Sequence, residues 1–123
     1  MNKQRIDRYM KEAIELLQNL EIVQNGKISK TFRGYISSFG AAITMGSLRS
    51  AIAFNSEQGG ADKERQKLMQ IIYRLIKKPE DVENKKLLTY VIEKNNDVEL
   101  KEEIIDAAIA VKLAMNMYQL EKE

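Results

Sequence analysis

The stretch GYISSFGAAITMGSLRSAIAF, which runs from Gly34 to Phe54, is apolar but carries little side-chain bulk. Its small residues recur at every fourth position and are called the small-residue row: Gly34, Ser38, Ala42, Gly46 and Ser50. On a helix, this spacing places them all on one face. Three structures would need such a face: a membrane span, a closely packed helix at the centre of a soluble bundle, or a surface that lets another backbone come near.

The flanking arginines exclude the membrane span. The uncharged run between Arg33 and Arg49 is 15 residues long, whereas a membrane-spanning helix needs about 20 predominantly apolar residues. The larger side chains of the stretch suffice to bury it in a core; they are Tyr35, Ile36, Phe39, Ile43, Leu48 and Ile52. We therefore expect a central helix, with a neighbouring helix packed closely against the small-residue row.

Helical periodicity extends over the rest of the chain. Apolar residues recur at steps of three and four, which is the period of one helix face, and no run alternates in the manner of a strand. The predicted buried faces comprise Ile6, Met10, Ala13, Leu17 and Leu20 in a first helix; Leu68, Ile72, Leu75 and Ile76 in a middle helix; Leu88, Val91 and Ile92 in a shorter helix over residues 82–94; and Leu100, Ile104, Ala107 or Ala108, Val111, Met115 and Tyr118 in the last.

Capping residues and helix breakers set the predicted boundaries. Gly26 suits a left-handed cap after the first helix, and Ser29 can cap a second helix that starts near Lys30. That helix continues through the opening stretch, with a kink near Gly40 or Gly46. The remaining expected boundaries are an end at the paired glycines 59–60, a cap at Asp62, an end before Pro79 and a cap at Asn96 or Asp97. The prediction is an all-α bundle of five or six helices, with no sheet, in one domain that spans residues 1–123.

The composition removes most catalytic chemistries. The chain contains no Cys and no His, which excludes disulfides, thiol catalysis, imidazole acid–base chemistry and metal sites built on these ligands. No glycine-rich phosphate-binding motif follows a strand-like run. We therefore expect a protein that is not an enzyme and that holds no metal and no cofactor. Its charged, helical N-terminus is unlike a signal peptide, which predicts a cytoplasmic protein without a membrane anchor.

Charge is distributed unevenly along the chain. Residues 1–78 contain 14 Lys and Arg against 7 Asp and Glu, whereas residues 79–123 contain 6 against 11, so the two parts carry +7 and −5. No acid occurs from Ile22 to Ser56. Such a chain can present a positive face to a polyanion and an acidic face to a basic neighbour.

Four segments carry a resemblance to a known family. They are QRIDRYMKEAI (4–14), FRGYISSFGAAITMGSLRSAIAF (32–54), KKLLTYVIEK (85–94) and IIDAAIAVKLAMNMY (104–118). The second ends in an LxxAxAF-like run, and the third contains a Leu-Leu-x-Tyr helix. In this order, and over most of the chain, they resemble the small subunit of type III-B CRISPR–Cas effector complexes, an all-helical protein of RNA-guided assemblies.

The resemblance implies a non-catalytic subunit that acts in antiviral defence. Copies would stack head to tail beside the backbone subunits that hold the guide RNA, with the large subunit as a further partner. Their basic faces would line the target-RNA channel and hold the RNA backbone without reading its sequence. The charge asymmetry would suit such stacking. The Phe and Tyr side chains fall mostly on apolar faces, so we expect them in the core and not as stacking partners for bases.

The predicted RNA-binding residues lie in the positive part of the chain. They are Arg5, Lys30, Arg33 and Arg49, with Arg8 and Lys27 as weaker candidates. The alternative for Arg33 or Arg49 is an ion pair with an acid of the last helix. The alternative function is that of a helical adaptor that forms homo-oligomers without binding nucleic acid, and a small DNA-binding regulator ranks third.

Overall fold

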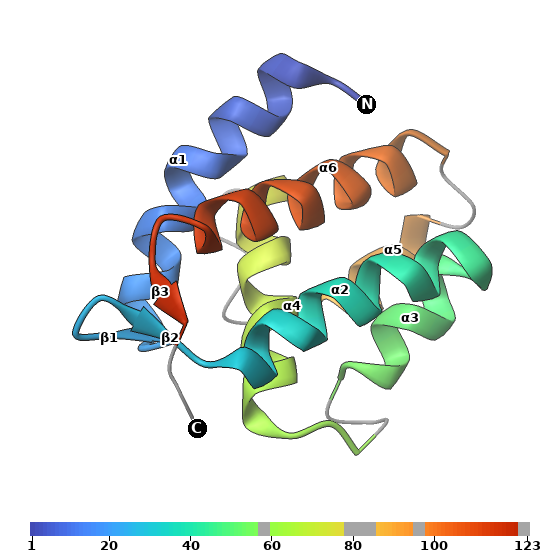
Figure 1. Ribbon diagram of the computed structural model, residues 1–123. Coiled ribbons are helices and arrows are strands. Elements are labelled where there is room, and N and C mark those ends of the chain that lie inside the picture. Colours follow the sequence, from blue (N-terminus) through green and yellow to red (C-terminus); the bar gives the residue numbers. More distant parts are fainter. Residues whose placement is uncertain (57–59, 78–85, 95–97, 121–123) are drawn as a thin grey trace.

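Six helices and three two-residue strands make up most of the part of the chain that the computed structural model describes, residues 1–56, 60–77, 86–94 and 98–120. In chain order they are α1 (Lys3–Asn19), β1 (Val23–Gln24), β2 (Lys27–Ile28), α2 (Lys30–Met45), α3 (Leu48–Phe54), α4 (Lys63–Ile76), α5 (Leu87–Lys94), α6 (Val98–Met115) and β3 (Gln119–Leu120). Figure 1 shows α6 in the middle, in contact with α1, α2 and α4, while α3 and α5 pack together at one end. The predicted helical class is confirmed, and the prediction of no sheet is wrong.

A hairpin between α1 and α2 accounts for the sheet. Asn25 and Gly26 have φ values of +55° and +73°, the left-handed pair that a two-residue hairpin turn requires and that an Asn-Gly sequence favours. The turn joins β1 to β2 in antiparallel pairing, and β3 adds to β2 in parallel. Gly26 therefore does not cap the first helix, which ends at Asn19. The strands are too short for any alternation to be visible in the sequence.

Side-chain caps start the helices where the sequence predicts them. The Ser29 Oγ accepts a hydrogen bond from the backbone N–H of Phe32 at 3.1 Å, and an Asp62 carboxylate oxygen accepts one from the N–H of Arg65 at 2.9 Å. Each cap satisfies a donor that has no partner within its own helix. The expected caps at 96 or 97, the stop at 79 and the first residues of the 82–94 helix lie outside the described residues.

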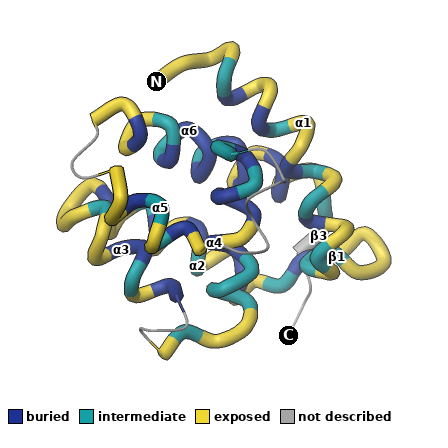
Figure 2. The backbone as a smooth tube through the Cα atoms, turned by 180° about the vertical axis from the view of Figure 1, so that it is seen from behind, coloured by how far each residue is buried: buried dark blue, intermediate teal, exposed yellow. Residues whose placement is uncertain are grey.

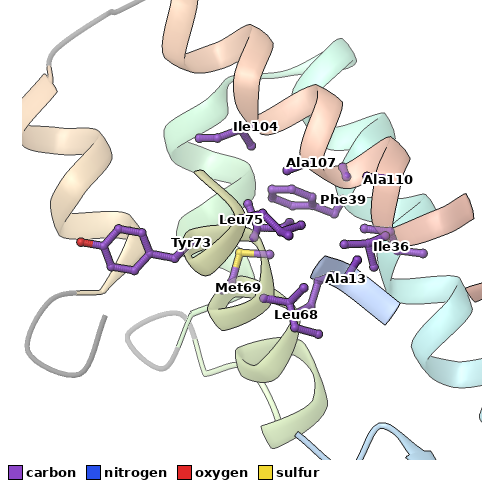
Figure 3. Close-up of a cluster of buried hydrophobic side chains, with 14 of the residues drawn as sticks. Ala13, Ile36, Phe39, Leu68, Met69, Tyr73, Leu75, Ile104, Ala107 and Ala110 are labelled. Carbon is purple, nitrogen blue, oxygen red and sulfur yellow. The ribbon is translucent and has the colours of Figure 1, made fainter. Parts of the chain in front are cut away.

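The core lies along α6. The faces of α1, α4 and α6 predicted from the sequence are largely buried (Figure 2), and Figure 3 shows Ile36 and Phe39 of α2 directed toward Ala107 and Ala110 of α6. Small buried residues of α6 let the three neighbouring helices approach it closely. They are Ala107, Ala108, Ala110 and Ala114. One predicted core residue, Ile92, is 51% exposed, because α5 lies at the edge of the bundle and turns Leu87 and Val91 inward.

The small-residue row faces solvent, which corrects the expectation of a close helix contact along it. Every one of its residues is exposed, and a Cβ added at Gly34 would meet no atom within 4 Å. The bulky residues of α2 lie on the opposite side of the helix and are buried: Phe32, Ile36, Phe39 and Ile43. The expected kink is a complete break, since α2 ends before Gly46 and the Ser47 side chain caps α3. The closely packed central helix is α6, not the opening stretch.

Candidate nucleic-acid interface

Arg5 lies in the first turn of α1 and forms a partly buried ion pair with α6. Its Nη2 and Nε lie 2.8 and 2.9 Å from Oδ2 of Asp106, and the backbone N–H of Asn2 donates to the same oxygen at 3.3 Å. Burial opposes the charge of the guanidinium, but the hydrogen bond and the negative charge of Asp106 outweigh it and raise the pKa of Arg5. The last helix thus supplies an acid to Arg5, the role left open in the sequence for Arg33 or Arg49.

Lys27, Lys30 and Arg33 lie close together, in β2 and the first turn of α2. All three are exposed, and the spacing of Lys30 and Arg33 puts them on one side of the helix. Among the described residues, the side chains of these two form no ion pair or hydrogen bond. This end of α2 therefore presents a group of cations that no acid of the described chain neutralises by direct contact.

Arg49 lies far from this group. It follows the C-terminal end of α2, whose 16 residues give a length of about 24 Å. There it lines a shallow depression of about 350 Å³ with Val91, Val98 and Lys101. Arg8, in α1, lies over the ring of its neighbour Tyr9, 5.5 Å from the centroid. The predicted cations are thus not one cluster: the structure places Lys30 and Arg33 at one end of α2 and Arg49 at the other.

A second shallow groove, of about 330 Å³, runs between α2 and α6. Small side chains form much of its wall, including Ser37, Gly40 and Ala41 of α2. Lys112 is the charged residue of its lining, and Arg33 lies one turn before Ser37. Between its cationic ends, the outer face of α2 consequently offers short, uncharged side chains, which allow another backbone to approach.

A contact between a cation and two aromatic rings lies where α2, α3 and α4 meet. The Arg65 guanidinium carbon is 4.3 Å from the ring centroid of Tyr35 and 4.7 Å from that of Phe54. The Tyr35 hydroxyl donates a 2.5 Å hydrogen bond to Asp62, whose other oxygen caps α4 at Arg65. This hydrogen bond is the main cause that lowers the pKa of Asp62 and raises the pKa of Tyr35.

Phe54 corrects the expectation for the aromatic residues. Phe32, Phe39 and Tyr73 are in the core as predicted, but Phe54 is 61% exposed. The reason is that α3 has seven residues, too few to fix a buried face by periodicity, and that Ile52 fills the inward position. Arg65, which contacts the Phe54 ring, was not predicted from the sequence either, although it lies three residues after the cap at Asp62.

Asp106 and Lys112 were also missed, and for them a signal exists. They are the only charged residues in the otherwise apolar run from Ile104 to Met115. A lone charge in such a run needs a partner or an outlet to solvent. In the structure, Asp106 has a partner in Arg5, and Lys112 is exposed to solvent.

No group of three or more acidic side chains among the described residues is placed to hold a metal ion. No helix in the described part is both apolar and long enough to cross a membrane.

Comparison with known proteins identifies the family. A family model described as CRISPR-associated protein (Cas_Cmr5) matches residues 4–115, which include α1, the basic end of α2 and all of α6. Neither the curated proteins nor the solved structures gave a match. The model covers most of the chain, and the chain therefore belongs to the Cas_Cmr5 family of CRISPR-associated proteins, the small subunits of Cmr effector complexes.

Proposed function

We propose that the protein is the non-catalytic small subunit of a type III-B effector complex and that the outer face of α2 contacts the backbone of the target RNA. The observation that carries this proposal is the arrangement on α2: exposed Lys30 and Arg33 at its start, Arg49 just beyond its end, and short uncharged side chains between them. Lys112 adds a cation beside the α2–α6 groove. In antiviral defence, such a subunit holds the target while the guide supplies sequence specificity.

Electrostatics on this face favours a polyanion. No acid occurs between Ile22 and Ser56, so the face carries positive charges and no carboxylate from its own segment. Short side chains such as Gly34, Ser38 and Ala41 leave room for a sugar–phosphate backbone against the helix. Contacts of this type give an affinity that is insensitive to sequence and that falls as salt rises, because bound phosphates release their counterions.

The depression at the other end of α2 suits a protein neighbour. Val98, which lines the depression, is 71% exposed. Met45, 87% exposed, and Ile92, 51% exposed, are neighbours in the sequence of the lining residues Gly46 and Val91. Exposed apolar side chains grouped in this way mark contact surfaces. We propose that an adjacent subunit of the complex, a stacked copy or a backbone subunit, covers these apolar side chains and leaves Arg49, which also lines the depression, in contact with the RNA. The same surface would serve a homo-oligomeric adaptor, which remains the alternative function.

Salt dependence of RNA binding separates these two functions. Target-RNA affinity of the assembled complex is measured from about 50 to 200 mM salt for the parent and for Lys30→Ala, Arg33→Ala and Arg49→Ala combined. Each lost phosphate contact should lower the slope of log affinity against log salt by about 0.7, and the three together by about 2. Lys11→Ala, which removes an exposed cation of α1, serves as the matched control. An unchanged slope in the folded triple variant would favour the adaptor.

A further inference from the structure

We propose that Phe54 and Arg65, supported by Tyr35, form a stacking platform for an unpaired nucleobase. The proposal rests on the proposed function, since it adds a base contact to the backbone contacts of α2. It starts from an unusual exposure: the ring of Phe54 is 61% accessible to solvent, although it lies at the end of a helix whose Ala51 and Ile52 are buried.

The ring of Phe54 is not a loose surface side chain. Arg65 contacts it at 4.7 Å and contacts the Tyr35 ring at 4.3 Å. The guanidinium lies against both rings, and Asp62 ties the two ends of this arrangement together, because it accepts the hydroxyl of Tyr35 and caps α4 at the backbone N–H of Arg65. Residues from α2, α3 and α4 thus hold an aromatic face in place before any ligand arrives, which reduces the entropic cost of binding.

The charges around this face suit a nucleotide. Within the part of the chain that the structure describes, the Arg65 guanidinium forms no salt bridge, although it interacts with Tyr35 and Asp62. A phosphate of the bound nucleotide would be a second anionic partner for it. Lys63 is exposed on the adjacent turn. Among the described residues, the acid shown in contact with the cluster is Asp62, which is engaged by Tyr35 and the α4 cap. Aromatic rings combined with arginine are how proteins bind single-stranded RNA without sequence preference.

Position and surroundings favour RNA over a protein partner. Tyr35 lies in α2 five residues after Lys30, which is about 8 Å along the helix axis, so one strand can reach both the phosphate contacts and the ring. The exposed apolar residue Val98 lines the depression at the α2–α3 junction. Phe54 does not line that depression, which is the surface assigned above to a protein neighbour.

The test measures stacking directly in the assembled complex. Target RNA carrying 2-aminopurine is titrated with the parent complex and with Phe54→Ala, Phe54→Leu and Phe54→Trp, at the salt concentrations used for the charge variants. Quenching of 2-aminopurine reports stacking. Met117→Ala serves as the control, because Met117 is exposed to a similar extent, 64%, and lies outside the platform.

We expect Phe54→Ala and Phe54→Leu to abolish quenching at one position of the RNA and to weaken binding by about 5- to 150-fold, without changing the salt slope. Phe54→Trp should preserve both. Normal quenching and affinity in Phe54→Ala would overturn the platform, even where the charge variants change the slope and the backbone contacts stand. A Phe54→Ala protein that melts like the parent but no longer joins the complex would assign Phe54 to a protein contact, which also overturns the proposal.

Discussion

Replacing Arg5 by Met tests whether the ion pair between α1 and α6 is structural. Met retains the apolar stem of the side chain but removes the guanidinium. Asp106 would then keep only the backbone N–H of Asn2, at 3.3 Å, as a donor, while its side chain is 2% exposed. A carboxylate left in that position is buried and has no cationic partner.

The expected loss of stability is large. Removing one partner of a buried pair typically costs about 3–5 kcal/mol. A domain of this size has a total unfolding free energy of about 6–18 kcal/mol at the usual stability per residue. The loss corresponds to a fall in melting temperature of about 10–20 °C. The double variant with Asp106→Ala should recover part of the loss, since it leaves no unpaired buried charge, and the coupling should be about 1–3 kcal/mol.

Urea denaturation of the isolated protein gives these free energies for the parent, both single variants and the double variant. Target-RNA binding by complexes assembled at low temperature is measured in parallel, and we expect Arg5→Met to leave the salt slope unchanged. A variant within about 0.5 kcal/mol of the parent, combined with a lower salt slope, would refute the reasoning. Arg5 would then be the RNA contact that the sequence predicted.

Four further variants test single features of the structure. Ala42→Leu, in the exposed row, should change the unfolding free energy by no more than about 0.5 kcal/mol, whereas Phe39→Ala should cost about 3–5 kcal/mol; thermal melts compare the two. Gly26→Ala should destabilise the hairpin by about 1–2 kcal/mol, because its φ of +73° is unfavourable for a side chain, and chemical denaturation measures this. Tyr35→Phe should remove the hydrogen bond that lowers the pKa of Asp62. This hydrogen bond stabilises the fold at pH values above 3.8, the ordinary pKa of the carboxyl, and its contribution is lost as the pH falls below that value. Thermal melts over a pH series should therefore show a lower stability than the parent near neutral pH and no difference in acid.

Most of the fold could be predicted because the buried face of a long helix is visible in the sequence as a regular spacing of apolar residues. The stripe through Ala13 and Leu17 and the one through Ile104 and Val111 are both buried as expected. The hairpin at Asn25 could not be recognised by alternation, since its strands have two residues each. The small-residue row was misread because small residues at a four-residue spacing indicate one face of a helix but not whether that face is covered.

The candidate site was predictable in its charges and not in their pairing. Lys30 and Arg33 of the acid-free segment are exposed cations, and their contact with RNA stays a prediction. Sequence spacing gave no indication that Arg5 meets an acid 101 positions away. The contact of Arg65 with Phe54 likewise joins two helices across a loop, and only the packing of α3 against its neighbours decides which ring stays exposed. Side-chain periodicity reports local faces, whereas partners across the bundle depend on tertiary structure.

The most direct measurement of the central claim, that the outer face of α2 lies on the RNA path, is site-specific photo-crosslinking in the assembled complex. A photoreactive amino acid replaces Ser38, which is exposed midway along α2; a matched protein carries it at the exposed Glu12 of α1. Irradiation with labelled target RNA should give an RNA adduct from position 38 and none from position 12. Adducts from position 38 to protein subunits alone, with the RNA bound, would contradict the account.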